Sequence, residues 1–406
     1  MLQSVNCLPI IPDRLYFTIT RITQRSKPTM FSYSIDSDEE YQYYPFFSDF
    51  GPLSLLQIHK FRLLTNKILN EHTEKVQFYT NLNPQTIANA SLLITSYLLI
   101  EQHLTPEEAL KPLSNILPTL KPYRDASSLP SKYSLTVGAC IRGLYHAMQI
   151  GWYDPNNFDA KDWEKYEQVE NGDMNWLIPN KLLAFASPYA TNCIRGGWRV
   201  ATPQDLVPVF AEKKITRVVR LCQRFYDEDI FKRANFEHTE LYFLDGSTPP
   251  PEILTQWLKI IEGSDIVALH CKAGLGRTGT LAACYMIKDF GFTGHEAIGW
   301  IRICRPGSII GDQQGYVLKY YENISGNSKS PKGNKSPKKS SEDEVSHAPT
   351  KVLRNALKKE IPHKTSAASV HTRNSLAGGL QVTGLRLTPK TPQPRKYNRA
   401  NSVAKK

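Results

Sequence analysis

Residues 266–290 constrain the fold of this chain more than any other segment does. They read IVALHCKAGLGRTGTLAACYMIKDF. The apolar run 266–269 is typical of a buried strand, and apolar residues return at helical spacing from Thr278 until Gly291, where a helix should stop. Between strand and helix lies a glycine-rich loop, residues 271–277. This order predicts an α/β domain with an anion-binding cradle, because loop N–H groups and a helix N-terminus both attract phosphate.

Cys271 and Arg277, at the two ends of this loop, predict a reactive site. A thiol attacks only as a thiolate, and the field that attracts a phosphate also favours the thiolate form of Cys271. Arg277 offers two parallel N–H donors to a dianionic phosphate. We therefore expect Cys271 to form a phosphocysteine that water then breaks, with no metal and no cofactor. We expect His270 to organise the loop by hydrogen bonds. The other predicted phosphate-binding residues are Lys272, Ala273, Gly274, Leu275, Gly276 and Thr278.

The sequence HCKAGLGRTG resembles the signature loop of the cysteine-dependent protein tyrosine and dual-specificity phosphatases. Three further segments, residues 175–189, 245–250 and 302–314, resemble the mitotic-exit dual-specificity phosphatases of the cell-division-cycle-fourteen family. They read NWLIPNKLLAFASPY, DGSTPP and RICRPGSIIGDQQ. The resemblance covers residues 14–321, and the segments occur in the family's order.

This resemblance implies a substrate and a place in the cell. It implies hydrolysis of phosphoserine, phosphothreonine and phosphotyrosine in proteins, with preference for a following proline and a nearby downstream basic residue. It also implies reversal of cyclin-dependent-kinase phosphorylation in cell-cycle control. The expected location is the nucleus and cytoplasm, with the nucleolus, spindle pole or centrosome as family sites.

Asp245 directly follows a predicted strand at residues 240–244. Loops at this end of α/β strands carry functional groups, and a carboxylic acid there can protonate the leaving oxygen and then activate water. The alternative is a structural Asp-Gly turn. The resemblance assigns Asp245 the general-acid role, and implies that Gln313 or Gln314 positions the hydrolytic water. The choice between these two stays open, because the next residue is glycine where the family usually has another glutamine.

The N-terminal half repeats the same pattern without its reactive residues. A predicted strand at 76–80 and helix at 88–104 precede a T-x-x-E-A sequence at Thr105, which recurs at Thr293. We interpret this as duplication of one α/β unit, although a capping box alone explains the short match. The first loop, NLNPQT, lacks both Cys and Arg. The predicted fold is therefore two tandem dual-specificity-phosphatase-like α/β domains, mixed sheets flanked by helices, with only the second active, as the resemblance also implies.

An acidic segment separates the two predicted domains. Its acidic residues recur at near-helical spacing and should lie near one face of a helix. A solvated linker helix is one interpretation, but ligand sites favour domain boundaries. The resemblance implies a groove for a basic substrate residue. The groove residues are Glu164, Glu167, Glu170 and Asp173.

The sequence predicts five parts along the chain. They are a flexible lead 1–13, an inactive domain 14–158, a linker helix 159–173, a catalytic domain 174–324 and a disordered tail 325–406.

The net charge of +12 divides unevenly along the chain. Residues 325–406 hold 18 Lys/Arg and 4 Asp/Glu, giving +14, so the remainder carries −2. The basic tail therefore gives no reason to expect specific nucleic-acid binding by the folded part. The most apolar run, 90–100, is too short to span a membrane. Seven scattered cysteines show neither metal-ligand nor disulfide spacing, which favours a reducing intracellular compartment.

The tail carries proline-directed phosphorylation motifs. Ser336 is followed by Pro and has Lys three residues downstream. We expect a proline-directed kinase to modify the tail, and the modified tail to be a substrate of the chain's own site. The Ser/Thr-Pro steps are at Ser330, Ser336, Thr388 and Thr391.

Three other interpretations fit part of the sequence. A buried cysteine beside a tight turn fits the Cys–Arg spacing but not the flanking His, TG, strand and helix. Phosphoinositide phosphatases share the loop pattern but tend to carry a second Lys where this chain has Leu275. A catalytically dead phosphoprotein-binding scaffold is disfavoured, because Cys271, Arg277 and Asp245 are all intact.

Overall fold

In the computed structural model, which describes residues 6–128, 130–195 and 197–327, the N-terminal half forms a four-stranded sheet. Its order is β1-β2-β4-β3, and the central strand β4 runs parallel to both of its neighbours. The strands are β1 (Asn6–Ile11), β2 (Leu15–Ile19), β3 (Met30–Ser34) and β4 (Lys75–Thr80). The predicted flexible lead, residues 1–13, is therefore partly wrong. Strand β1 pairs antiparallel with β2 and buries Ile10, which the short segment's own pattern did not indicate.

Helices of the N-terminal half begin at side-chain caps that the sequence provides. Ser54 and Gln57 form a capping box at the start of α1, and Asn83 caps α2. Every residue of α2 from Ile87 to Ile100 is buried, which explains why this segment is apolar all round. The helices are α1 (Leu55–Glu71), α2 (Pro84–Glu101), α3 (Pro106–Leu110) and α4 (Val137–Gln149). Short 3₁₀ turns are Glu39–Tyr41, Lys111–Leu113, Leu117–Thr119 and Val169–Asn171.

The C-terminal half, as far as the structure describes it, forms a five-stranded sheet of order β10-β9-β11-β6-β5. The central strand β11 is parallel to β9 and β6, and β5 closes one edge antiparallel to β6. A strand with parallel neighbours is covered on both faces and reads as a continuous apolar run, as 266–269 does. The strands are β5 (Met174–Ile178), β6 (Leu182–Ala186), β9 (Arg217–Arg220), β10 (Glu237–Glu240) and β11 (Val267–Cys271), with a hairpin of β7 (Cys193–Arg195) and β8 (Trp198–Val200).

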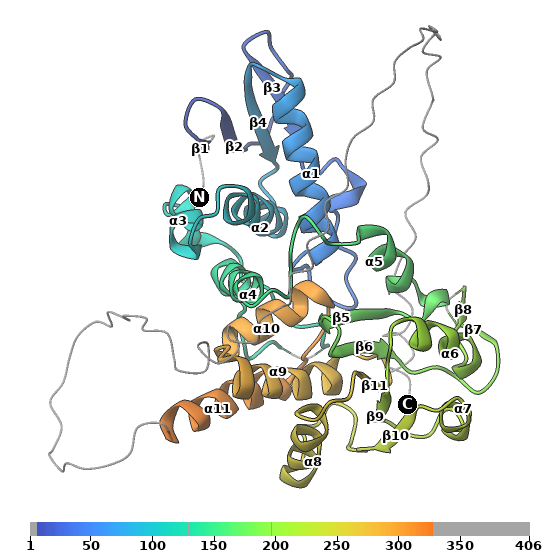
Figure 1. Cartoon of the computed structure of the whole chain (residues 1–406). Helices are drawn as coiled ribbons and strands as arrows, with labels where there is room; N and C mark the ends of the chain where they lie inside the picture. The colour runs from blue at the N-terminus through green and yellow to red at the C-terminus, as the bar shows by residue number, and fades with distance from the viewer. Residues whose placement is uncertain (1–5, 129, 196, 328–406) are drawn as a thin grey trace, which may run out of the picture. The chain divides into compact units, whose positions relative to one another are not determined.

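Helices cover both faces of this second sheet. Alternate residues of β11 point to opposite sides. Leu269 joins the core beneath α9 and α10, whereas Ala268 packs with Phe210 and Phe231 from α6 and α7. Figure 1 shows α9, α10 and α11 side by side. The helices are α6 (Pro203–Glu212), α7 (Asp229–Arg233), α8 (Pro251–Ile261), α9 (Gly276–Phe290), α10 (Gly294–Cys304) and α11 (Asp312–Asn327).

Helices α4 and α10 join the two halves at close range. A Cβ atom at Gly143 would lie 2.5 Å from the carbonyl oxygen of Glu296, and one at Gly299 would lie 2.9 Å from that of Ala139. Each glycine thus allows the opposite backbone to approach. The described residues of both halves belong to one compact unit, with a shared hydrophobic core.

Between the halves, helix α5 (Ala160–Glu167) is shorter than the predicted linker helix 159–173. Asp159 caps its start. The chain then makes a 3₁₀ turn that ends at Gly172, with a φ of 110°, and Asp173, with a φ of 48°. These left-handed residues end the helical path.

The described residues end at residue 327. The predictions about the tail, including Ser336, concern residues beyond this point. Among the helices that are described, none combines the length and the apolar character needed to cross a lipid bilayer.

Candidate active site

The glycine-rich loop joins the end of β11 to the start of α9. Cys271 is the last residue of the strand and is 3% exposed. The N-cap residue of α9, Leu275, makes no side-chain capping hydrogen bond, so this residue leaves the first N–H groups of the helix to other acceptors. Gly274 has a φ of 67°, and a Cβ atom there would lie 2.0 Å from the carbonyl oxygen of Phe185. The loop therefore has the features of a phosphate cradle.

The remaining loop residues contribute mainly backbone. The carbonyl of Lys272 accepts a hydrogen bond from the N–H of Ser187 at 3.1 Å. Gly276 is the first residue of α9, and Thr278 is fully buried within it. The Oγ1 atom of Thr278 has no hydrogen-bond partner among the described residues. The structure thus keeps the predicted phosphate-binding residues together on one loop and helix start.

Arg277 is buried beneath the loop and held by one end of its guanidinium. Its Nη1 donates to the carbonyls of Leu221 at 3.0 Å and Phe243 at 2.9 Å. Its Nε has no partner within the described part of the chain, and its Nη2 lies 3.0 Å from Oδ1 of Asp245. Nη1 is thus an anchor, whereas Nε and Nη2 form the edge that can face a phosphate.

Asp245 comes to this site from the loop after β10. Its side chain is 53% exposed and forms an ion pair with the buried Arg277 guanidinium. The structure therefore brings Asp245 and Arg277 into direct contact, although they are distant in the sequence. A solvent-facing carboxyl group beside the phosphate-binding edge has the access that a proton donor to a leaving group needs.

The two adjacent glutamines have different surroundings. The Oε1 of Gln313 accepts from the N–H of Ile310 at 3.1 Å, and its Nε2 donates to the carbonyl of Ser247 at 3.0 Å. A Cβ atom at Gly276 would lie 2.7 Å from Gln313 Oε1, so this side chain lies against the glycine-rich loop. Gln314 instead accepts from Arg302 at 2.8 Å and donates to the carbonyl of Gly311. Only Gln313 touches the loops that carry Asp245 and Arg277.

The predicted acidic groove residues differ in their exposure to solvent. Glu164 is half-buried and pairs with Lys60 of α1 at 3.1 Å. Glu167 and Asp173 are buried, and Glu170 is half-buried. The groove therefore stays a prediction, in which Glu164 and Glu170 are the members that solvent reaches.

Arg305 supports the glycine-rich loop, and sequence reasoning missed this residue. Its Nε donates to the carbonyl of Gly274 at 2.7 Å and its Nη2 to that of Ala273 at 3.0 Å. Its Nη1 lies 2.8 Å from Asn175 Oδ1 and 3.1 Å from Asp173 Oδ1. Arg305 is fully buried, and the buried Asp173 balances its charge. The sequence signal that could have identified Arg305 is its place in the RPG segment, which carries part of the family resemblance.

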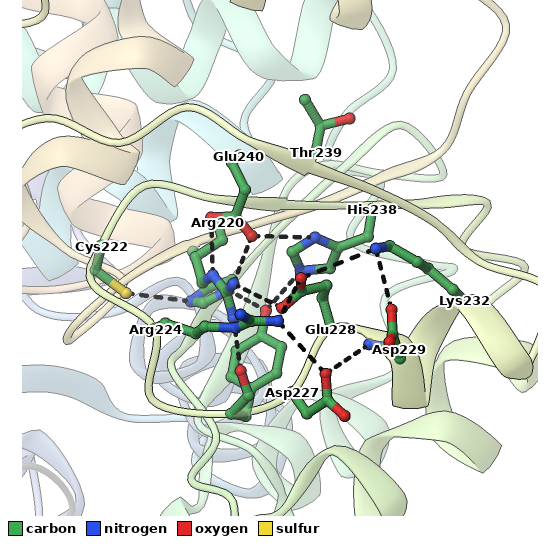
Figure 2. Close-up of polar contacts among 12 residues, drawn as sticks. Arg220, Cys222, Arg224, Asp227, Glu228, Asp229, Lys232, His238, Thr239 and Glu240 are labelled. Atoms are coloured by element: carbon green, nitrogen blue, oxygen red, sulfur yellow. Dashed lines mark hydrogen bonds and ion pairs between the residues drawn. The ribbon is translucent and has the colours of Figure 1, made fainter.

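A polar network surrounds the buried Arg220, the last residue of β9 (Figure 2). Figure 2 shows the Arg220 guanidinium between Glu240 and Glu228, with His238 pointing toward Glu240. Arg220 Nε donates to Glu240 at 2.9 Å, and its Nη2 donates to Glu228 at 3.1 Å. Arg220 also donates to the carbonyl of Tyr226 at 2.9 Å and lies over the Tyr226 ring. These charge-assisted bonds fix the segment that follows β9 against β10.

Tyr226 connects this network to the reactive strand. Its hydroxyl lies 3.0 Å from Nε2 of His238 and 2.8 Å from Nε2 of His270. His270 Nδ1 lies 3.0 Å from the carbonyl oxygen of Cys271, which can only accept, so we assign the proton to Nδ1. Burial lowers the pKa of His270 to about 3 and that of His238 to about 4. Both rings are therefore neutral at neutral pH, which agrees with an organising role for His270.

The other buried cysteines are poor nucleophiles. Burial raises the pKa of Cys140, in α4, and that of Cys222, after β9, to about 12. Burial also raises the pKa of Cys284 and Cys304. A buried thiol without stabilising charge stays protonated and inert. Cys271 is distinguished by its place beside a helix N-terminus and the Arg277 loop.

Known families match both halves of the chain. The family described as "Dual specificity protein phosphatase, N-terminal half" matches residues 9–147. The family described as "Polymorphic toxin system, DSP-PTPase phosphatase" matches residues 194–291. The predicted fold of two phosphatase-like domains is confirmed by these matches.

Curated relatives extend this match across the described region. Dual specificity protein phosphatase CDC14AB of Danio rerio is 44% identical over 314 residues, 76% of this chain and 51% of the relative. CDC14A of Mus musculus is 42% identical over 320 residues, 78% of this chain and 53% of the relative. CDC14C of Homo sapiens is 38% identical over 312 residues, 76% of this chain and 69% of the relative. The chain spans about half the length of the CDC14A relatives that it matches. This chain belongs to the CDC14 family of dual specificity protein phosphatases.

Proposed function

We propose that this chain is a cysteine-dependent protein phosphatase that hydrolyses phosphoserine, phosphothreonine and phosphotyrosine. The observation that carries the proposal is the buried Arg277, one end of the loop that begins at Cys271, whose Nε has no partner among the described residues and whose Nη2 pairs only with the exposed Asp245 carboxylate. In the first step, Cys271 Sγ attacks phosphorus, the bond from phosphorus to the leaving oxygen breaks, and Asp245 gives that oxygen a proton. In the second step, water attacks phosphorus, Asp245 takes a proton, and the S–P bond breaks.

Substrate binding exchanges one anion for another at Arg277. In the free chain, Asp245 Oδ1 lies 3.0 Å from Arg277 Nη2. A phosphate dianion that binds Nε and Nη2 in parallel displaces this carboxylate, since a bidentate pair is the stronger interaction. Once it leaves Arg277, Asp245 takes a proton from solvent and turns toward the leaving oxygen as the phosphate arrives. Anchoring of Nη1 to the carbonyls of Leu221 and Phe243 keeps the guanidinium in place during the exchange.

Gln313 rather than Gln314 positions the hydrolytic water in this proposal. Its contacts with Ile310, Ser247 and the Gly276 region support this role. Gln314 is committed to Arg302 and to the loop backbone.

The preferred substrate is a phosphoserine followed by proline with a downstream basic residue. Glu164 and Glu170, the half-buried acidic residues of the linker, are the groups that we expect to bind the basic residue of the substrate. Proline-directed sites are those of cyclin-dependent kinases, so the proposal includes reversal of their phosphorylation in cell-cycle control. Its partners are such phosphoproteins and a proline-directed kinase that acts on the tail, and its location is the nucleus and cytoplasm.

Two phosphoserine-Pro peptides test this function, one with Lys and one with Glu three residues after the phosphosite. We expect wild type to release phosphate faster from the Lys peptide, without added metal. Cys271→Ser should reduce release on the order of 10⁴-fold or more, because the nucleophile is lost. The matched control is Cys140→Ala, which removes an inert thiol and should leave the rate unchanged.

Each outcome separates a part of the proposal. Equal release from both peptides would keep the phosphatase and reject the acidic groove. No release from either peptide, with release from a soluble inositol phosphate, would favour a lipid-type substrate. If Cys271→Ser binds the peptides but wild type releases no phosphate from any substrate, the chain acts as a scaffold.

A further inference from the structure

The loop before α11 has an unusual backbone and lies next to the reaction centre. Gly307, Ile309 and Gly311 have φ angles of 84°, 59° and 56°. The left-handed region is a genuine outlier for a β-branched residue such as Ile309. Such conformations persist only where the surroundings determine them, and they gather at functional sites. The loop leads directly into Gln313, so whatever holds it also orients Gln313.

The catalytic domain supplies part of this support. Arg302 is fully buried, and its Nε and Nη2 donate to the carbonyls of Ser308 at 2.9 Å and Ile309 at 2.7 Å. The N–H of Ile310 donates to Gln313 Oε1 at 3.1 Å. These bonds satisfy the carbonyls of the loop but leave the N–H of Gly311 to another acceptor.

The N-terminal domain provides that acceptor. Oδ2 of Asp125 accepts a hydrogen bond from the N–H of Gly311 at 2.7 Å, and Asp125 is 1% exposed. Its other oxygen, Oδ1, is buried without a hydrogen-bond partner among the described residues. Phe46, also from the N-terminal domain, packs against Gly307, where a Cβ atom would lie 2.6 Å from the ring. The domain without reactive residues therefore holds the loop at two points.

Charge supports the same contact. Burial lowers the pKa of the Arg302 guanidinium, and Tyr133 and Asp125 of the N-terminal domain oppose this change. A buried carboxylate is stable only where donors and positive charge compensate it. The Gly311 N–H and the Arg302 charge provide that compensation for Asp125.

We propose that Asp125, across the domain boundary, is a positioning residue for the second chemical step, the hydrolysis of the phosphocysteine. The inference rests on the proposed function. Asp125 fixes the Gly311 peptide, the adjoining Ile310 N–H holds Gln313 Oε1, and Gln313 Nε2 reaches Ser247 in the Asp245 loop. Loss of Asp125 releases Gln313 and misplaces the attacking water. The first step does not use Gln313, so it should persist.

Stopped-flow hydrolysis of p-nitrophenyl phosphate by the full chain tests this inference. The initial burst of p-nitrophenolate reports phosphocysteine formation, and the later steady rate reports its hydrolysis when that step limits turnover. In Asp125→Ala we expect a burst stoichiometric with enzyme and a steady rate lowered roughly ten- to hundredfold, because small misplacements of reacting groups are costly. Asp125→Asn should behave as wild type, since its amide oxygen still accepts from Gly311.

The matched control is Lys132→Ala. Lys132 Nζ lies 2.8 Å from Asp312 Oδ1 across the same boundary and beside the same loop, but the two side chains are 79% and 73% exposed. We expect no change in burst or steady rate, because exposed ion pairs contribute little. In a Gln313→Ala background, Asp125→Ala should have no further effect, since both act through one group.

Four results would overturn the inference. They are equal loss of burst and steady rate in Asp125→Ala, no loss of either, slow turnover in Asp125→Asn, or an additive loss in the double variant. Wild type without phosphate release would instead reject the proposed function itself. An active wild type with an unchanged Asp125→Ala rejects only the positioning role.

Discussion

The two halves of the molecule contain the same strand–loop–helix unit, but the start of the helix differs between them. In the N-terminal unit, β4 leads into α2, whose start is closed by the Asn83 side chain, which accepts from the N–H of Gln85 at 3.0 Å. Pro84 is the first residue of that helix and has no N–H to offer. In the catalytic unit, β11 leads into α9, whose N-cap residue, Leu275, makes no side-chain cap.

This difference teaches what turns a common fold unit into an anion site. Both central strands have parallel neighbours, and both units are followed by a capping box, at Thr105 and Thr293. The shared architecture supplies the helix dipole in each case. Only the second unit leaves the helix N-terminus without a side-chain cap and adds Cys271 and Arg277. Elsewhere in the N-terminal half, the loop before α4 contributes Asp125, which accepts a hydrogen bond from the Gly311 N–H of the second half.

Among the tests of this comparison, the largest effect is expected from Arg277→Lys, which removes the guanidinium that the N-terminal unit lacks. Lysine keeps the charge but cannot offer parallel donors or hold the carbonyls of Leu221 and Phe243. We expect kcat to fall about 10²–10³-fold, in the range found when a transition-state donor is lost. Steady-state kinetics with a phosphoserine peptide measures this, and the melting temperature checks the fold. Undiminished turnover would reject the role of Arg277.

Gly143→Ala tests the joint between the two units. A Cβ atom at this position would lie 2.5 Å from the Glu296 carbonyl oxygen and 3.0 Å from the Trp300 nitrogen, both backbone atoms. We expect the free energy of unfolding to fall by about 1–3 kcal/mol, as in other overpacked contacts. The control is Gly138→Ala in the same helix, where the nearest atom is an Arg142 side-chain nitrogen at 3.4 Å. Urea denaturation that finds equal stability for both variants would contradict the close packing.

The free energy of unfolding should depend on pH because His270, in β11, is buried. His270 has its pKa lowered to about 3 by burial, whereas an unfolded histidine titrates near 6.5. Between these values the unfolded state binds more protons, so the free energy of unfolding falls as pH falls. We expect a loss of about 2 kcal/mol from this group at pH 5 relative to pH 7. Urea denaturation of His270→Asn should show a smaller loss of unfolding free energy between pH 7 and pH 5. An unchanged loss would show that His270 is not its source.

The smallest effect is expected from Asn83→Ala, which removes the side-chain cap at the start of α2 in the N-terminal unit. Loss of the cap should lower the free energy of unfolding by about 1 kcal/mol without changing phosphate release. Asn83→Asp keeps a capping oxygen and should retain stability. Urea denaturation and peptide hydrolysis measure the two properties. A fall in activity with intact stability would mean that this loop also serves the reaction.

The sequence by itself determined the local features. The strand, loop and helix at residues 266–290, both capping boxes and the reactive pair Cys271 and Arg277 could be predicted, because short-range spacing specifies them. The missing Cys and Arg in the first copy also predict that it is inactive. The sequence misjudged the start of the chain and the length of the linker helix, since pairing of β1 with β2 and left-handed residues such as Asp173 are decided by neighbours.

Only the tertiary structure decided which distant groups meet. It separated Gln313 from its neighbour Gln314, joined Asp173 to Arg305 beneath the loop, and brought Asp125 to Gly311. Each of these contacts joins segments far apart in the chain or depends on one side chain's direction. Their physical basis is burial, because a buried charge or N–H group must find a partner wherever the fold places one.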